Sequence, residues 1–214
     1  MWYSYKWKFI GFKNYQAVFA MKFFRKILIL TAVFFILSQN TILALDDVSA
    51  HAAILMEQST GDVLYAKNAD AQSLIASTTK IMTALVALEH ADLNQSVKIS
   101  EKAVGVEGSS VYLKVGEILT MEQLLCALML ESANDAAAAI AIAVAGDIDS
   151  FADMMNERAA ALGLCDTSFK NPHGLDHGEH YTSAHDLALI AAEALKNEDF
   201  KKISSTYKKS FYTE

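Results

Sequence analysis

The chain has 214 residues, of which 53% are hydrophobic and one is proline; this suits one medium domain, or a domain plus a small lobe, rather than a disordered polypeptide. Its formal net charge is −7, but residues 1–44 hold six of the 18 basic residues and no acidic residue. The rest of the chain therefore carries a net charge of −13, which argues against nucleic acid as a partner and against tight electrostatic binding to anionic lipid.

The N-terminal segment has the pattern of an export signal. Residues 21–26 include three basic residues, Lys22, Arg25 and Lys26, and residues 27–37 are apolar. Cleavage is expected after Ala44, with Ser49-Ala50 as a second option. A membrane anchor is less favoured, because a spanning helix needs about 20 apolar residues and the polar residues 38–40 interrupt the run. We therefore expect export across the cytoplasmic membrane to the extracellular, cell-wall side.

This pattern divides the chain into three segments. Residues 1–20 are predicted to be an over-called extension ahead of a true start at Met21, with a long basic leader region as the alternative. Residues 21–44 are predicted to be the signal peptide. Residues 45–214 are predicted to form the functional domain.

The first part of that domain is predicted to be a hairpin followed by a helix. Two short apolar runs, residues 52–57 and 63–67, flank a glycine-containing loop, as in a β-hairpin. Residues 77–90 are predicted to be a helix with a buried face, because apolar residues recur at helical spacing at Ile81, Ala84, Leu85 and Leu88. Residues 97–99 are expected to be a short strand, and residues 105–116 a loop.

The remainder is predicted to be mostly helical. Thr120 and Gln123 form a capping box ahead of an apolar helix over residues 124–130. The last helix has Thr182 or Ser183 as its cap. The other expected elements are helices over residues 135–144, 151–162 and 183–195 and a loop over residues 171–181.

Ser77–Lys80 is an S-x-x-K sequence at the start of the helix predicted over residues 77–90. It places a hydroxyl and an amine one turn apart on one face, the minimal set for a serine nucleophile with a lysine base. Burial would lower the pKa of the Lys80 amine toward a value useful for a base. Taken singly, Ser77 also fits an ordinary helix cap and Lys80 a surface lysine. A second S-x-x-K, Ser205–Lys208, lies in a polar tail.

Ser132 and Asn134 interrupt two apolar helices. A turn there would expose a hydroxyl able to relay a proton and a carboxamide able to donate to and accept from an amide substrate. The S-x-N pattern is weak alone, since residues 38–40 share it. Combined with Ser77 and Lys80 in an exported chain, it favours catalysis.

Three segments of the chain closely resemble the low-molecular-mass penicillin-binding proteins, which are serine-type D-alanyl-D-alanine carboxypeptidases. The segments are residues 76–83, residues 130–136, and residues 171–176 followed by residues 180–183. The resemblance runs from about Ala52 to about Leu195. It implies an α+β fold of the β-lactamase/transpeptidase-like type, an antiparallel sheet flanked by helices plus a mainly helical lobe. Residues 45–214 would then be a partial catalytic domain of this type.

The resemblance also implies roles for named residues. Ser77 would be the acylated nucleophile, Lys80 its base, and Ser132 and Asn134 the second motif. Ser110 would lie in the family's loop beside the site and contact substrate. The implied partners are a peptidoglycan stem peptide ending in D-Ala-D-Ala and, as covalent inhibitors, β-lactam antibiotics. No metal or organic cofactor is implied.

Two other groups of residues have alternative interpretations. A cluster of histidines with Glu179 suggests a zinc site. These residues fall in or beside the family's Asn-Pro-His-Gly-Leu segment, which favours a structural role. The histidines are His173, His177, His180 and His185. Cys126 lies in an apolar helix and is expected in the core. A disulfide between Cys126 and Cys165 stays open.

The chain departs from the family in one respect. The family's third motif, Lys-Thr-Gly, is absent, and the nearest string, residues 209–211, lacks the glycine. We therefore expect a truncated reading frame or fragment whose last sheet strands are missing and whose 214-residue product is inactive or unstable. Membrane attachment is expected only if a full-length form has a C-terminal anchor.

Two alternatives to the carboxypeptidase remain. A serine β-lactamase would need a deacylating glutamate in a loop after S-x-N, and residues 171–176 fit the carboxypeptidase loop better. A non-catalytic cell-wall-binding fragment is favoured by the missing third motif and disfavoured by the first two motifs.

Overall fold

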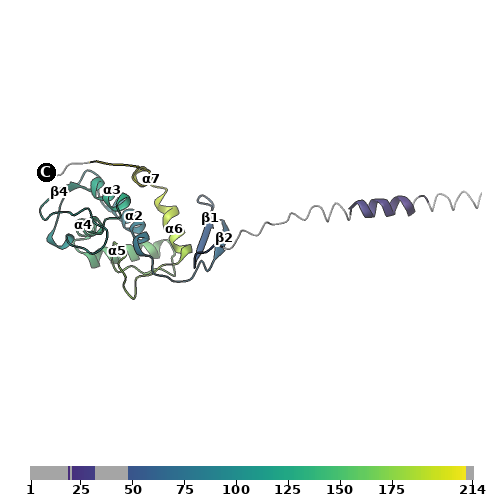
Figure 1. Ribbon diagram of the computed structural model, residues 1–214, viewed down its shortest axis with the longest axis horizontal. Helices are drawn as coiled ribbons and strands as arrows, with labels where there is room; N and C mark the ends of the chain where they lie inside the picture. The colour runs from purple at the N-terminus through teal and green to yellow at the C-terminus, as the bar shows by residue number, and fades with distance from the viewer. Residues whose placement is uncertain (1–18, 20, 32–47, 211–214) are drawn as a thin grey trace, which may run out of the picture. The chain divides into compact units, whose positions relative to one another are not determined.

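The structure is a computed structural model that describes residues 19, 21–31 and 48–210 (Figure 1). The chain divides into two units, residues 1–48 and residues 49–214. In the first unit residues 21–31 form a helix, and no helix of the described part of the chain is long and apolar enough to cross a membrane. The predicted cleavage site after Ala44, and nearly all of the predicted extension, lie outside the described residues.

The first sheet of the second unit is the predicted hairpin. β1 (Ala53–Met56) pairs antiparallel with β2 (Val63–Lys67), with a register shift between Leu55 and Met56. Gly61 in the connecting loop has φ +77°, a conformation that glycine adopts without a Cβ clash. The hairpin prediction is confirmed.

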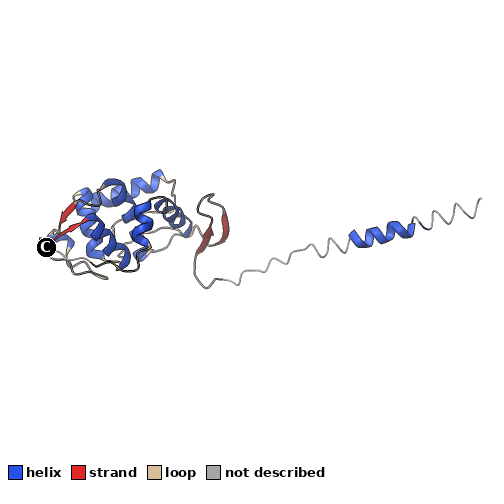
Figure 2. Ribbon diagram, turned by 90° about the horizontal axis from the view of Figure 1, so that it is seen from above, coloured by secondary structure: helices blue, strands red, loops and turns tan. Residues whose placement is uncertain are grey.

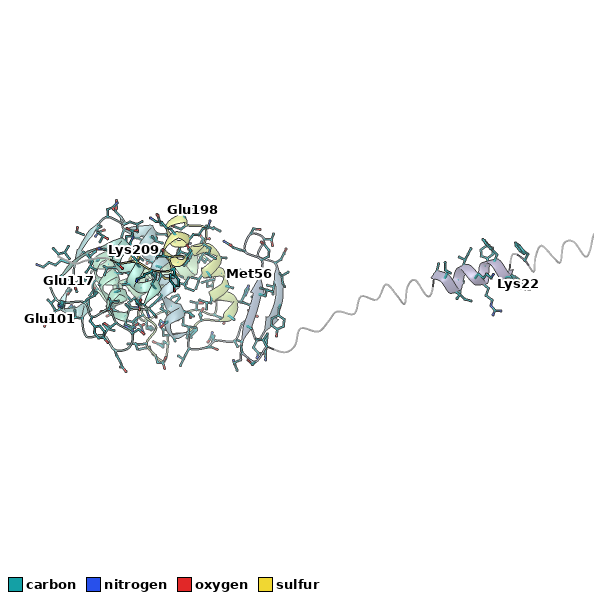
Figure 3. All side chains as sticks on the ribbon, turned by 45° about the horizontal axis from the view of Figure 1, so that its top comes forward. Lys22, Met56, Glu101, Glu117, Glu198 and Lys209 are labelled. Atoms are coloured by element: carbon teal, nitrogen blue, oxygen red, sulfur yellow. The ribbon has the colours of Figure 1, made fainter. Side chains whose placement is uncertain are left out.

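The second sheet is smaller. β3 (Ser96–Lys98) pairs antiparallel with β4 (Ile118–Thr120). The strand predicted over residues 97–99 is confirmed to within one residue. Strand β4 was not predicted, because it runs directly into the capping box of the next helix, whose N-cap is its last residue, Thr120. The two sheets lie at opposite ends of the unit, where Figure 2 draws the strands in red and Figure 3 labels Met56 and Glu117.

Helices occupy the space between the two sheets (Figure 1). The helix starts agree with their caps: Thr120 and Gln123 form the predicted reciprocal capping box, and Ser183 accepts a hydrogen bond from the Asp186 N–H. The elements are η1 (Ala76–Thr79), α2 (Lys80–His90), η2 (Glu101–Ala103), α3 (Met121–Leu130), α4 (Asn134–Ala145), α5 (Ile148–Ala161), α6 (Ala184–Ala194) and α7 (Glu198–Ser204).

Helix α7 was not predicted. It has only seven residues, of which Phe200 and Ile203 are buried, too short a repeat to stand out as a helical period. Asn197 caps its start by accepting from two backbone N–H groups. The second S-x-x-K follows α7, and both Ser205 and Lys208 are exposed, so this copy does not have the buried lysine that chemistry would require.

The core of the unit is built around α2, which packs against α3, α4, α5, α6 and α7. Helix α4 is buried from residue 134 to residue 141 and is mostly alanine, so neighbouring helices can approach its backbone closely. Larger side chains such as Phe151, Met155 and Phe169 fill the remaining volume. Since α2 lies at the centre, its first residue, Lys80, begins inside the protein.

The predicted loop over residues 171–181 is confirmed and is fastened to the start of α2. The Thr83 hydroxyl donates to the Pro172 carbonyl oxygen at 2.6 Å. Gly174, at φ +87°, lies so close to η1 that a Cβ there would be 1.9 Å from the Ala76 carbonyl oxygen. Only glycine permits this approach.

We expect Gly174→Ala to lower the free energy of unfolding by about 2–5 kcal/mol, from overpacking and from the left-handed backbone conformation. Gly178→Ala in the same loop is the matched control, because its Cβ would meet nothing within 4 Å. Urea unfolding of both variants measures the difference. Equal stabilities would show that the approach of Gly174 to Ala76 does not constrain the fold.

Candidate active site

The Lys80 amine is the centre of the candidate site. The side chain is 3% exposed, and its Nζ lies 2.7 Å from Asn134 Oδ1, 2.9 Å from the His173 carbonyl oxygen and 3.3 Å from Ser77 Oγ. These partners come from three separate parts of the chain. Three of the five predicted site residues, Ser77, Lys80 and Asn134, are thus brought together, and Lys80 is not a surface lysine.

The start of the helix differs from the prediction. Ser77 lies in the 3-10 turn η1, and the α-helix begins only at Lys80. In a 3-10 turn residues i and i+3 lie one above the other, which brings the Ser77 hydroxyl over the Lys80 amine. Ser77 is not a helix cap; its side chain is exposed and lines a cavity. The preceding Ala76 has φ +45°, unusual for a residue with a Cβ.

Burial determines the ionisation of Lys80. Desolvation lowers the pKa of its amine from 10.5 to about 8. The neutral amine has two N–H donors and one lone pair. The protonated amine donates to Asn134 Oδ1, the His173 carbonyl oxygen and Ser77 Oγ. After loss of one proton, the two remaining donors match Asn134 and His173, and the lone pair is left to accept the Ser77 hydroxyl proton.

Asn134, the first residue of α4, is held on both sides. Its Oδ1 accepts from Lys80, its Nδ2 donates to the Glu107 carbonyl oxygen, and its backbone N–H donates to the Ser109 carbonyl oxygen at 2.7 Å. Gly108 is needed here, since a Cβ would lie 2.7 Å from Asn134 Nδ2. The second Nδ2 hydrogen has no partner among the described residues, and Asn134 lines the cavity.

Ser132 lies in the turn between α3 and α4 with φ +56°. Its hydroxyl makes no hydrogen bond to any residue within 48–210. Ser132 also does not line the cavity beside Ser77. The structure therefore does not join Ser132 to Lys80 and Ser77. A proton relay through Ser132 stays a prediction.

Ser110 contacts a residue that the sequence reasoning missed. Its hydroxyl donates to Asp135 Oδ2 at 2.6 Å, and this buried carboxylate also accepts from the Val111 and Leu113 N–H groups. Asp135 therefore fastens the loop that carries Gly108 and Ser109. An acid in the first turn of α4 was a visible signal, but it is also common at helix starts. Substrate contact through Ser110 stays a prediction; Ser109 lines the cavity and Ser110 does not.

The ring of each histidine in the predicted cluster has a different hydrogen-bond partner. Burial, and then the charge of Lys80, lower the pKa of the His173 ring to about 4. The His180 ring lies between Thr79 and Lys170. No three His, Cys, Asp or Glu side chains of the described residues gather as a metal site. Cys126 is buried as predicted, and both it and the exposed Cys165 are free thiols.

An open cavity of about 650 Å³ adjoins Ser77. One side is formed by Ala76 and Ser77, a second by residues 107–109 and Asn134, and a third by the loop of residues 173–176. The arrangement is that expected for a nucleophile, its base and an amide-binding group. The nucleophile would be the exposed Ser77 hydroxyl, the base the Lys80 amine with its lowered pKa, and the amide-binding group the Asn134 carboxamide.

We expect the Lys80 amine to titrate with a midpoint near pH 8. Carbon-13 labelling of the lysine side chains and NMR spectra over a pH series would reveal it as a resonance absent from Lys80→Met. The pKa of Lys80 is lowered because its amine is buried and its hydrogen-bond partners are neutral oxygens, not carboxylates. A midpoint above pH 10 would contradict the assignment of Lys80 as a base.

Comparisons with known proteins show which family the chain is similar to. A family model described as D-alanyl-D-alanine carboxypeptidase matches residues 38–214. The chain is 42% identical over 163 residues to the D-alanyl-D-alanine carboxypeptidase DacF of Bacillus subtilis (strain 168), covering 74% of this chain and 42% of that protein. It is 37% identical over 171 residues to the D-alanyl-D-alanine carboxypeptidase of Streptomyces sp. (strain K15), covering 74% of this chain and 59% of that protein.

Solved structures show the same fold. The crystal structure of the D-alanyl-D-alanine carboxypeptidase DacD from Francisella tularensis superposes with a TM-score of 0.71 and 37% identity over 74% of this chain and 40% of that one. Penicillin binding protein 5 from Haemophilus influenzae has a TM-score of 0.74 and 29% identity over 80% and 53% of the two chains. The predicted α+β transpeptidase-like fold class is confirmed, and the chain spans about half the length of these relatives.

Proposed function

Because the chain belongs to the D-alanyl-D-alanine carboxypeptidase family of peptidases, we propose that it removes the terminal D-alanine from peptidoglycan stem peptides through an acyl-enzyme on Ser77. The observation that carries the proposal is the buried Lys80 amine, whose pKa is lowered to about 8 beside the exposed Ser77 hydroxyl. No other described serine has such a base at hydrogen-bond distance.

The proposed reaction begins with neutral Lys80. Ser77 Oγ attacks the carbonyl carbon between the two D-alanines while its proton moves to Lys80 Nζ. The new C–O bond forms, the C–N bond breaks, and the proton passes to the leaving D-alanine amine. Water then cleaves the ester, which releases the shortened peptide and restores the Ser77 hydroxyl.

Asn134 and the cavity supply substrate binding in this proposal. The free Nδ2 hydrogen of Asn134 would donate to a peptide carbonyl of the substrate, while its Oδ1 keeps hold of Lys80. The cavity of about 650 Å³ beside the exposed Ser77 would receive the substrate peptide. β-Lactams, which present a strained amide, would acylate the same hydroxyl and act as covalent inhibitors.

We further propose that the protein works outside the cytoplasmic membrane, where its substrate lies. The basic residues 21–26, followed by the apolar residues 27–37, support this. Of these, residues 21–31 form a helix whose large hydrophobic side chains are exposed.

Acylation by a fluorescent penicillin tests the function. It is measured in the 214-residue chain and in a chimera. The chimera consists of residues 45–210 followed by the C-terminal part of the Bacillus subtilis relative, starting where the segment that matches this chain ends. Labelling of the chimera is expected. Slow or no labelling is expected of the 214-residue chain, because its sequence lacks the Lys-Thr-Gly motif, which by the family resemblance would supply half of the oxyanion hole. Losing one oxyanion donor costs on the order of 10²–10³ in rate. Ser77→Ala should abolish the label.

Ser205→Ala is the matched control, because it removes the serine of the exposed S-x-x-K and should leave labelling unchanged. Labelling that survives Ser77→Ala would assign the nucleophile elsewhere. A correctly folded chimera with no label at all would contradict the proposed function.

Export is tested by sequencing the N-terminus of protein collected from the cell-wall fraction of the producing cells. The first residue is expected to be Leu45, or His51 if cleavage follows the second option. Protein that stays in the cytoplasm and begins at Met1 or Met21 would contradict the proposal.

A further inference from the structure

His180 is a buried titratable group that the proposed reaction does not use. The side chain is 1% exposed and lies at the end of the loop of residues 171–181, more than 100 positions along the chain from the turn it touches. Its Nε2 is 2.8 Å from the Thr79 hydroxyl oxygen, and its Nδ1 is 3.0 Å from the Lys170 backbone nitrogen.

These two contacts determine the tautomer. The backbone N–H of Lys170 can only donate, so Nδ1 of His180 must accept and carries no proton. The neutral ring therefore has its proton on Nε2 and donates it to Thr79 Oγ1. Burial lowers the pKa of the ring, which keeps it in this neutral form.

The residues that hold the His180 ring in place make no hydrogen bond to Ser77. Its ring packs edge-on against Phe169, with ring centroids 5.7 Å apart. Phe169 is held by Asn156, which donates to its carbonyl and accepts from its N–H, both at 2.8 Å. The neighbouring residues Ser168 and Tyr181 form an antiparallel bridge. His180 is therefore a fixed point.

Thr79 connects this fixed point to the reacting groups. It is the last residue of η1, between Ser77 and Lys80, and its side chain is buried. Although it stands at the N-cap position of α2, its hydroxyl makes no capping hydrogen bond and is bonded to His180 instead. The hydroxyl also lies against Gly174, where a Cβ would come within 2.9 Å of it.

We propose that His180 is a positioning residue, which holds Thr79 and thereby the turn that keeps the Ser77 hydroxyl over the Lys80 amine. The inference rests on the proposed function of Ser77. The turn η1 begins at Ala76, whose φ of +45° is sparsely populated for a residue with a Cβ. Such a backbone conformation persists only when contacts with the rest of the fold determine it. The hydrogen bond from His180 is such a contact, and it is made at the buried side chain of Thr79, the residue between Ser77 and Lys80 in which the turn ends.

The test uses paired variants at both ends of the hydrogen bond. Thr79→Val and His180→Leu remove it, whereas Thr79→Ser keeps the hydroxyl and His180→Gln keeps one donor and one acceptor. The first-order acylation constant of Ser77 with fluorescent penicillin should fall tenfold or more in the first pair, because small displacements of a reacting group are costly. It should stay within about threefold in the second pair. The double variant Thr79→Val/His180→Leu should be no slower than either single one.

Arg158→Met is the control for a purely structural effect, since it removes the ion pairs with Glu89 and Glu193 and changes no contact of η1, Phe169 or His180. It should lower the melting temperature but leave the acylation constant unchanged below that temperature. If Arg158→Met slows acylation as much as His180→Leu at equal loss of stability, or if His180→Leu leaves the rate unchanged, the positioning role is overturned.

The inference can fail separately from the proposed function. Nitrogen-15 NMR of histidine in the 214-residue chain reads the tautomer without any reaction, and a ring protonated on Nδ1 would overturn the inference while leaving Ser77 untouched. The acylation rates are measured in the chimera, where loss of the label in Ser77→Ala establishes the nucleophile first. Unlabelled wild-type chimera with the expected tautomer would count against the function alone.

Discussion

The burial of one amine is the constraint on which the rest of the site depends. An ammonium group taken out of water costs several kcal/mol unless the protein supplies acceptors or the group gives up its proton. Lys80 does both: it has two oxygens within 3 Å, and its pKa falls to about 8. The lone pair that appears on loss of the proton has the Ser77 hydroxyl as its neighbour. A group that would only destabilise an ordinary core therefore becomes the feature that makes an exposed serine a candidate nucleophile.

Backbone geometry, as much as side-chain chemistry, brings the surrounding groups to this amine. One acceptor is a main-chain carbonyl oxygen, that of His173, and the Asn134 carboxamide is itself anchored on the carbonyl oxygen of Glu107. Both segments come close because Gly108 and Gly174 leave room where a Cβ would collide. The polar groups of the site are thus satisfied mostly by one another and by the main chain, as buried polar groups must be.

The sequence was sufficient for those features whose causes are local. The hairpin, the capping box at Thr120 and the apolar helices follow from short patterns, and the two motifs around Ser77 and Asn134 were identified together with the family. Features that depend on distant contacts were missed. Asp135 resembles any acid at a helix start until the loop that it fastens is in place. His180 resembles a metal ligand until Thr79 and a backbone N–H occupy its two nitrogens.

The separation of the contacts along the chain has a consequence for when reactivity arises. The oxygens that hold Lys80 lie 54 and 93 positions away from it, so no segment shorter than most of the domain can assemble them. In a newly made or partly folded polypeptide the amine is in water, where a lysine is protonated at neutral pH and cannot accept a proton from a serine. Under the proposed function, the Ser77–Lys80 pair therefore acquires its reactivity only when the domain has folded around it.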